Sequence, residues 1–235
     1  MNLREKAYES FRQHLLKKSF RPGQFISQRE LVALTGLPLG AIREMIPRLE
    51  ADGLIVTIPQ RGMQIATVDL RLVRNAFQLR AVLEREAVAH FVRAASDTEI
   101  ATLVRAHAAV LKRAERGEVS KQLLDEAQMM DWRFHDTLIE KLDNELITGI
   151  YRVNSLRVRL IKLEQSLLSA ESLLPSLREH GVILAALEAR DAAAAVDAMD
   201  RHIASARLRA MGIADRTEAG PRPAPARQQR RTGTG

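Results

Sequence analysis

The sequence contains no cysteine among its 235 residues, which excludes disulfide bonds and thiolate metal sites. It also lacks a long apolar segment: the longest uninterrupted run of apolar residues, Val182–Leu187, is far too short to cross a bilayer. The residues that follow Met1 do not include the apolar stretch of a secretory signal. We therefore expect a soluble cytoplasmic protein that does not associate with membranes.

The formal net charge of +7 is distributed unevenly along the chain. Residues 1–66 carry a net charge of +4, residues 67–213 are neutral, and residues 214–235 carry +3. A basic region joined to a neutral one is typical of a nucleic-acid-binding domain attached to a domain with another role. Residues 214–235 contain no apolar side chain larger than alanine, so we expect a disordered basic tail there.

Residues 31–62 have the pattern of two short helices joined by a tight turn and followed by a hairpin. Gly36 lies in the turn, and apolar residues then recur at the spacing of a buried helix face within a second helix expected at about 39–52. Residues 54–58 and 63–65 form the two expected strands. Such an arrangement is how a protein places a helix in the major groove of DNA.

These motifs resemble the winged helix-turn-helix of GntR-family bacterial transcription regulators. The resemblance covers the first third of the chain and rests on Arg21-Pro22-Gly23, Gln28-Arg29-Glu30-Leu31, Thr35-Gly36, Ile42-Arg43-Glu44, Arg48-Leu49-Glu50, Asp52-Gly53-Leu54 and Arg61-Gly62. It implies a DNA-binding regulator in which Arg29, Gly40 and Arg43 face the bases or the backbone of DNA. The simpler alternative is a helical hairpin with a strand pair and no such role.

Basic residues of this region are the candidates for DNA contacts. Arg43, near the start of the second helix, can donate two hydrogen bonds to guanine, the commonest specific contact in the major groove. Arg29 and Arg48 are placed to reach phosphates or bases, and Arg61 and Gly62 belong to the wing tip over the minor groove. The alternative for Arg43 is a surface charge cluster with the neighbouring glutamate.

The chain departs from the family pattern at the start of the second helix. Relatives usually have a basic residue where this chain has Leu39, and a serine or threonine where it has Pro38 or Gly40. We therefore expect one guanine contact fewer and a different operator sequence. Pro47, inside the same helix, removes a backbone hydrogen bond and predicts a local bend.

Strand signals disappear beyond about residue 69, where Asp69 is a plausible helix cap. Six segments rich in strong helix formers follow, at about Leu70–Ala94, Asp97–Arg116, Ser120–Lys141, Asn144–Glu171, Leu174–Ala189 and Ala192–Met211. We predict a mainly α protein: a winged helix-turn-helix domain at residues 1–68, an all-α bundle at residues 69–213, and the tail at 214–235.

One carboxylate and three imidazoles of the bundle have the spacing of a metal site. Asp131 and His135 are four residues apart and share a helix face, while His180 and His202 lie on the apolar stripes of two later helices. This donor set suits a divalent ion, Zn²⁺ above all, with Ni²⁺, Mn²⁺ or Fe²⁺ also possible. A single histidine of this kind is more often a plain core or surface residue, so the argument depends on the set.

Residues from about Leu70 to Met211 resemble the FCD domain, the all-α ligand-binding domain of FadR-type GntR regulators. In that family a D-x-x-x-H pair and two later histidines bind a divalent metal, which implies this role for the four residues named above. Six helices are typical of the shorter VanR-type variant. The segment Leu79–Glu84 resembles the first helix of the domain, and there Arg80 is a candidate anion-binding residue. The alternative for Arg80 is a surface pair with Glu84.

These resemblances lead to a hypothesis of metabolite control. A small organic carboxylate would bind at the metal, with further contacts from Arg80, Arg133, Asn154 or Arg157. Its binding would shift a hinge near residues 67–70 and the spacing of two DNA-binding domains in a homodimer on double-stranded operator DNA, most simply as a repressor. The alternatives are an effector-independent DNA-binding protein with a structural metal, and a metal-dependent hydrolase, for which the metal-facing stripe offers no obvious general base.

Overall fold

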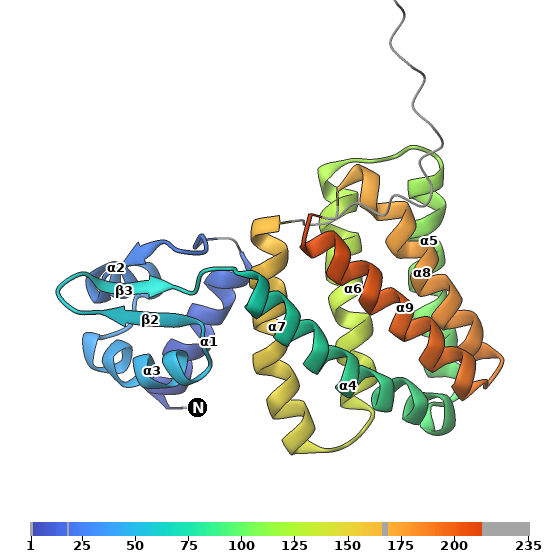
Figure 1. Cartoon of the computed structure of the whole chain (residues 1–235), viewed down its shortest axis with the longest axis horizontal. Coiled ribbons are helices and arrows are strands. Elements are labelled where there is room, and N and C mark those ends of the chain that lie inside the picture. Colours follow the sequence, from blue (N-terminus) through green and yellow to red (C-terminus); the bar gives the residue numbers. More distant parts are fainter. Residues whose placement is uncertain (1, 18, 166–168, 213–235) are drawn as a thin grey trace, which may run out of the picture.

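The N-terminal third of the protein is a winged helix-turn-helix. The structure, a computed structural model, describes residues 2–17, 19–165 and 169–212. We call residues 3–65 the head; its elements, shown in Figure 1, are α1 (Leu3–Leu16), β1 (Phe25–Ile26), α2 (Gln28–Thr35), α3 (Leu39–Ala51), β2 (Ile55–Ile58) and β3 (Gly62–Ile65). The three strands form an antiparallel sheet in the order β1-β3-β2, in which β2 and β3 are the two strands that the sequence pattern predicts.

Local sequence signals fix the angle between α2 and α3. Ser27 and Glu30 form a capping box that starts α2, since each side chain accepts a hydrogen bond from the backbone N–H of the other residue. Gly36 ends the helix with a φ of 68°, a left-handed conformation that favours glycine. Helix α3 is continuous through Pro47, and the bend expected there stays a prediction.

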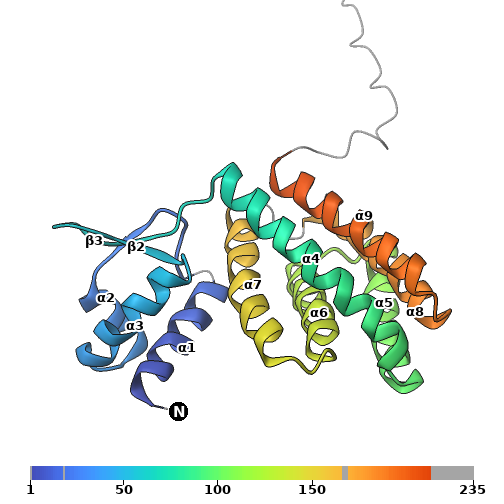
Figure 2. The same cartoon turned by 60° about the horizontal axis from the view of Figure 1, so that its bottom comes forward.

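The rest of the described chain is a bundle of six helices, which Figures 1 and 2 show from two directions. We call α4–α9 the bundle: α4 (Leu70–Ala94), α5 (Asp97–Glu115), α6 (Lys121–Glu140), α7 (Glu145–Gln165), α8 (Ala170–Glu188) and α9 (Ala192–Ala210). Asp69 caps α4 as predicted, by accepting a hydrogen bond from the backbone N–H of Leu72. Helix α9 packs along α4 and α8, which brings the last described helix against the first of the bundle.

The sequence prediction was wrong about the boundary between α7 and α8. It extended one helix to Glu171 and began the next at Leu174, whereas α8 begins at Ala170. The cause is a capping box that the pattern did not reveal: the backbone N–H of Ser172 donates to the side chain of Ser169, and the backbone N–H of Ser169 donates to the side chain of Ser172. The expected tail at 214–235 lies outside the described residues.

Helix α7 connects the bundle to the head. Its Leu156 and Leu160 are fully buried within the apolar core of the head rather than that of the bundle. Its Arg157 donates a hydrogen bond of 3.0 Å from Nε to the carbonyl oxygen of Asp52, at the end of α3. The Asp52 carboxylate in turn accepts a 2.6 Å hydrogen bond from the hydroxyl of Tyr8 on α1. The end of α3 is therefore held from the bundle and from α1.

Among the helices of the described residues, none is both long enough and apolar enough to cross a membrane.

Candidate metal centre

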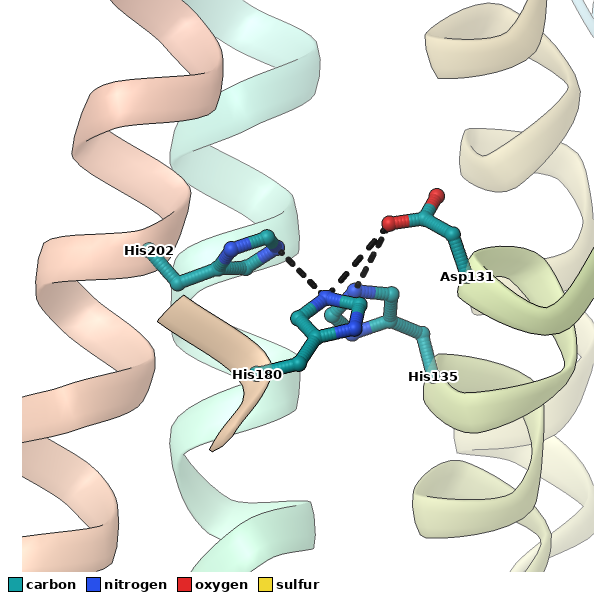
Figure 3. A group of neighbouring side chains, drawn as sticks. All are labelled: Asp131, His135, His180 and His202. Atoms are coloured by element: carbon teal, nitrogen blue, oxygen red, sulfur yellow. Dashed lines mark hydrogen bonds and ion pairs between the residues drawn. The ribbon is translucent and has the colours of Figure 1, made fainter. Parts of the chain in front are cut away.

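Four side chains from three helices of the bundle meet at one point. Asp131 and His135 come from α6, His180 from α8 and His202 from α9, and all four are buried. Each offers one possible ligand atom, and these atoms lie within 4.8 Å of one another. Figure 3 shows the three imidazole rings and the carboxylate turned toward a common centre. The structure thus brings together the residues that the spacing in the sequence singled out.

The Nε2 atoms of the three rings face the centre. Nε2 of His180 lies 3.3 Å from Nε2 of His202 and 3.5 Å from Oδ1 of Asp131. Nε2 of His135 lies 3.8 Å from the same carboxylate oxygen. The ring atoms on the other side, the Nδ1 atoms, point to different partners, and these partners determine where the protons lie.

Each Nδ1 atom lies beside an acceptor, and none of these acceptors was identified from the sequence. Nδ1 of His135 lies 2.9 Å from a carboxylate oxygen of Glu84, and Nδ1 of His202 lies 2.8 Å from one of Glu179. Nδ1 of His180 lies 3.1 Å from Nε2 of His107. Because a carboxylate can only accept, Nδ1 of His202 carries the hydrogen, and the nearness of Glu84 favours the same tautomer for His135.

The same reasoning assigns the proton of His180. Nδ1 of His107 lies 2.8 Å from the carbonyl oxygen of Leu103, which can only accept, so this nitrogen carries the hydrogen. Nε2 of neutral His107 is then an acceptor, and Nδ1 of His180 must donate to it. The Nε2 atoms of all three candidate ligands are consequently unprotonated and present their lone pairs to the centre.

Further side chains hold these acceptors in place. Glu84 accepts hydrogen bonds from Nε of Arg80 at 2.7 Å and from the hydroxyl of Tyr151 at 3.0 Å. Glu179 accepts two from Arg209, at 2.8 and 2.9 Å. Carboxylates that orient histidine ligands in this way are usual around protein-bound metals. The histidines are therefore fixed in a tautomer and an orientation suited to coordination.

The charges at the site agree with this protonation pattern. Burial lowers the pKa of His202 to about 4 and that of His180 well below its ordinary value, so the rings are neutral at pH 7. Burial opposes ionisation of Asp131, but the ammonium group of Lys162, 2.8 Å from its Oδ2, holds the pKa of this carboxyl well below its usual range. One carboxylate and three neutral imidazoles are the form in which such ligands bind a metal.

The ring nitrogens that face the centre of the cluster are arranged for a bound cation rather than for hydrogen bonds with one another. In the described part of the chain, both ring nitrogens of His135 are buried without a well-aligned hydrogen bond, although Nδ1 lies close to Oε2 of Glu84. Two unprotonated Nε2 atoms, those of His180 and His202, face each other at 3.3 Å, where they cannot share a proton in their assigned tautomers. A positive ion among them would satisfy all of these lone pairs. The cluster could therefore hold a divalent metal, and nitrogen with carboxylate ligands suits zinc and its neighbours.

A small cavity of about 20 Å³ adjoins the cluster, large enough for about one water molecule. Arg80 and Asn154, two of the residues expected to contact an effector, both line it. Arg80 is buried and pairs with Glu84, so the pair exists but lies in the core, not on the surface. Asn154 donates to the carbonyl oxygen of Ala76, and its own side-chain oxygen has no partner among the described residues.

The other two residues expected to contact an effector do not line this cavity. Arg133 is exposed on α6, because a residue two positions beyond Asp131 points away from the face that carries the cluster. Arg157 contacts the carbonyl oxygen of Asp52 in the head instead of the cavity. His107, in contrast, was given no role although it is buried beside the site. Its place on the apolar stripe of Ile100, Val110 and Ala114 was the available signal.

The head carries its basic residues on exposed positions around α3 and the wing. Arg29 is exposed, and Gly40 leaves open space at the start of α3, where an added Cβ would meet nothing within 4 Å. Arg43 is exposed and donates a 3.0 Å hydrogen bond to Gln28. The guanidinium groups of Arg48 and Arg61 stack on aromatic rings. The guanidinium carbon of Arg48 lies 4.0 Å from the ring centre of Tyr8, and the guanidinium carbon of Arg61 lies 4.7 Å from the ring centre of Phe25.

Comparisons with known proteins agree with this architecture. The family of bacterial regulatory proteins named gntR matches residues 3–65, and the FCD domain matches residues 75–205. The HTH-type transcriptional repressor GlaR of Escherichia coli (strain K12) is 26% identical over 200 residues, which cover 83% of this chain and 90% of that protein. The structure of E. coli McbR/YncC has a TM-score of 0.72 at 16% identity, covering 90% of this chain and 98% of that one.

The metal-free FCD domain of TM0439 resembles the bundle, with a TM-score of 0.51 at 18% identity over 63% of this chain and 97% of that chain. The matching families and relatives are transcription regulators and not enzymes, so the hydrolase alternative is wrong. The match to the FCD domain alone spans more than half of the chain. The protein is a DNA-binding transcription regulator and belongs to the gntR family of bacterial regulatory proteins with a C-terminal FCD domain.

Proposed function

We propose that this regulator is a cytoplasmic repressor whose affinity for operator DNA is controlled by a small carboxylate bound at a divalent metal in the bundle. The observation that carries the proposal is the convergence of four candidate ligands, Asp131, His135, His180 and His202. Their unprotonated Nε2 atoms and oriented rings are arranged as a metal site requires. Zn²⁺ is the preferred ion, and the same donors accept Ni²⁺, Mn²⁺ or Fe²⁺.

The DNA-binding part of the proposal rests on the exposed basic residues of the head. We assign base or phosphate contacts to Arg29, Gly40, Arg43, Arg48, Arg61 and Gly62. Arg43 is the residue proposed to recognise a guanine, since it is exposed near the start of α3. Arg48 would have to leave the ring of Tyr8 to reach DNA, which makes it the weakest member of the set. Two heads of a homodimer would bind the two half-sites of a palindromic operator.

The effector part rests on charge and on the donors beside the cluster. A bound divalent cation would supply positive charge to which carboxylate oxygens bind. Arg80, together with the unpartnered side-chain oxygen of Asn154, lines the adjoining cavity and limits what else can enter. Because that cavity of about 20 Å³ holds about one water molecule, a carboxylate must displace side chains on binding. Such displacement gives the ligand a different affinity for two conformations, which regulation needs.

A thermal-shift experiment tests the proposal. Zinc-loaded protein is screened against small carboxylates, and the screen is repeated after chelation. A ligand at 100 times its dissociation constant should stabilise the folded state by about 2.7 kcal/mol. Stabilisation that disappears on chelation supports a carboxylate held at the metal. If His180→Ala and His202→Ala leave the bound metal unchanged in elemental analysis, the assigned ligands are wrong.

The second candidate function is effector-independent DNA binding with a structural metal. It is favoured by the burial of all four candidate ligands and by the rigid hydrogen bonding of their rings. Stabilisation by metal alone, without response to any carboxylate, would support this alternative instead.

A further inference from the structure

A polar hollow separates the head from the bundle beside the metal centre. It has a volume of about 400 Å³ and is bounded by Glu9 and Arg12 of α1 on the side of the head. On the side of the bundle it is bounded by Asp136, Arg152 and Arg159 of α6 and α7. The hollow is about twenty times larger than the 20 Å³ cavity at the metal centre, so it has the room that the inner cavity lacks.

The large hollow and the small cavity share a wall. Asp136 and Arg159 line both spaces, and Trp132 lies beside them in the wall of the inner cavity. Asp136 and Arg159 also line a third hollow of about 670 Å³, together with Trp132 and with Gln13 of α1. These three side chains therefore stand between the metal centre and the spaces that open toward the head.

The wall is held by one ion pair. A guanidinium nitrogen of Arg159 lies 2.9 Å from Oδ2 of Asp136, and the guanidinium carbon lies 4.7 Å from the ring centre of Trp132. The side chain of Arg159 is 12% exposed and that of Asp136 is 36% exposed, so water reaches the carboxylate more easily than the guanidinium. A partly exposed ion pair of this kind contributes little to stability. Asp136 holds Arg159 through one hydrogen bond, so a carboxylate that arrives from the hollow can replace it and accept two hydrogen bonds from the guanidinium.

Unsatisfied donors also face this region. Among the described residues, Nε of Arg12 and Nε1 of Trp132 are buried without a hydrogen-bond partner. Arg12 lines the large hollow, and Trp132 lines the inner cavity. Both groups only donate, so an acceptor such as a carboxylate oxygen is what they lack.

We propose that the hollow between α1, α6 and α7 is the entrance for a carboxylate ligand to the metal centre, and that Arg159 exchanges Asp136 for the carboxylate of that ligand. This inference rests on the proposed function, because it assigns a route and a recognition residue to the same site. Since Glu9 and Arg12 of the head form the far wall, a ligand that opens this entrance pushes on α1. The metal centre and the DNA-binding head would then be coupled through their shared hollow.

The first experiment needs neither metal nor ligand. Trp132 is the only tryptophan of the chain, so its fluorescence reports on the entrance. Quenching by iodide, an anion, is compared in metal-free wild type, Asp136→Asn and Glu126→Gln. The control removes an equivalent ion pair, since Glu126 lies on the same helix and binds Arg113 at 2.6 Å on the surface. Asp136→Asn should raise the quenching constant, by up to about fivefold for a pair of this strength, and Glu126→Gln should not. Equal quenching constants in the two variants would overturn the proposal that this hollow is the entrance.

The second experiment tests recognition in the zinc-loaded protein, with malonate as the probe. The rise in melting temperature caused by malonate should disappear in Arg159→Gln and persist in Arg152→Gln, which removes a charge from the same helix and the same hollow. A shift retained in Arg159→Gln would refute the role of this residue while the proposed function stands. Absence of any malonate shift in wild type would count against the proposed effector and against the exchange at Arg159, whereas the iodide experiment decides the entrance separately.

Discussion

Replacement of Leu160 by alanine should destabilise the head although the residue belongs to a helix of the bundle. Leu160 is 0% exposed and is packed in the core of the head. Truncation of a buried leucine to alanine costs about 2–5 kcal/mol, since it removes apolar contacts and leaves a cavity. A domain of about 60 residues, the size of the head, has a total stability of roughly 3–9 kcal/mol. The substitution should therefore remove about half of the stability of the head.

The matched control is Leu146→Ala on the same helix. Leu146 is 80% exposed, so its truncation should change the free energy of unfolding by less than about 0.5 kcal/mol. Urea denaturation followed by circular dichroism gives the two free energies, and hydrogen exchange with mass spectrometry shows where protection is lost. Leu160→Ala should lose protection mainly in α1–α3. Equal stabilities of the two variants, or loss of protection confined to the bundle, would refute the view that α7 completes the head.

Three further predictions concern the metal, pH and DNA. His107→Phe keeps an aromatic ring but cannot accept the hydrogen bond from Nδ1 of His180. The affinity for zinc, measured by competition with a chelator, should therefore fall about 10- to 100-fold. An unchanged affinity would contradict the assigned tautomers. Hydrogen bonds from Lys141 and from the cap of α5 lower the pKa of Glu99 to about 2, so the ionised carboxylate contributes fully to stability above pH 4.5 and loses this contribution as the pH falls toward 2. The difference in unfolding free energy between wild type and Glu99→Gln should therefore shrink over that pH range. A difference that stays constant would exclude the charge of Glu99 as its source. Arg43→Ala should weaken operator binding in fluorescence anisotropy by roughly 5- to 150-fold, whereas an equal loss on unrelated DNA would assign Arg43 to phosphates.

The positions of the metal-ligand candidates could be predicted because their signals are local. Asp131 and His135 are one helical turn apart, and His180 and His202 lie on apolar stripes. The neighbouring residues of the same helix therefore predict that each side chain points into the core. The head was predictable for a similar reason, since capping residues and turn glycines act within a few residues. Family resemblance added the expectation that these separate local signals belong to one site.

The residues around the ligands could not be predicted, because their roles depend on contacts between helices far apart in the chain. Glu84 forms an i,i+4 ion pair with Arg80. The spacing of the two residues in the sequence is the same for an exposed pair and for a buried one. Only the packing of α4 against α6 makes it a partner of His135. The positions of Arg133 and Arg157 were not predictable for a related reason: Arg133 is exposed on its helix, and Arg157 contacts the head.

The two leucines that α7 contributes to the head bear on how the protein is made. During synthesis the N-terminal domain of a chain usually folds first. Here the head lacks part of its core until Leu156 and Leu160 have been translated, more than ninety residues after β3. His202, on α9, emerges later still. We therefore expect that a nascent or truncated chain binds neither operator DNA nor metal as the full-length protein does. A regulator that can bind DNA would then form only when its C-terminal domain has also been made.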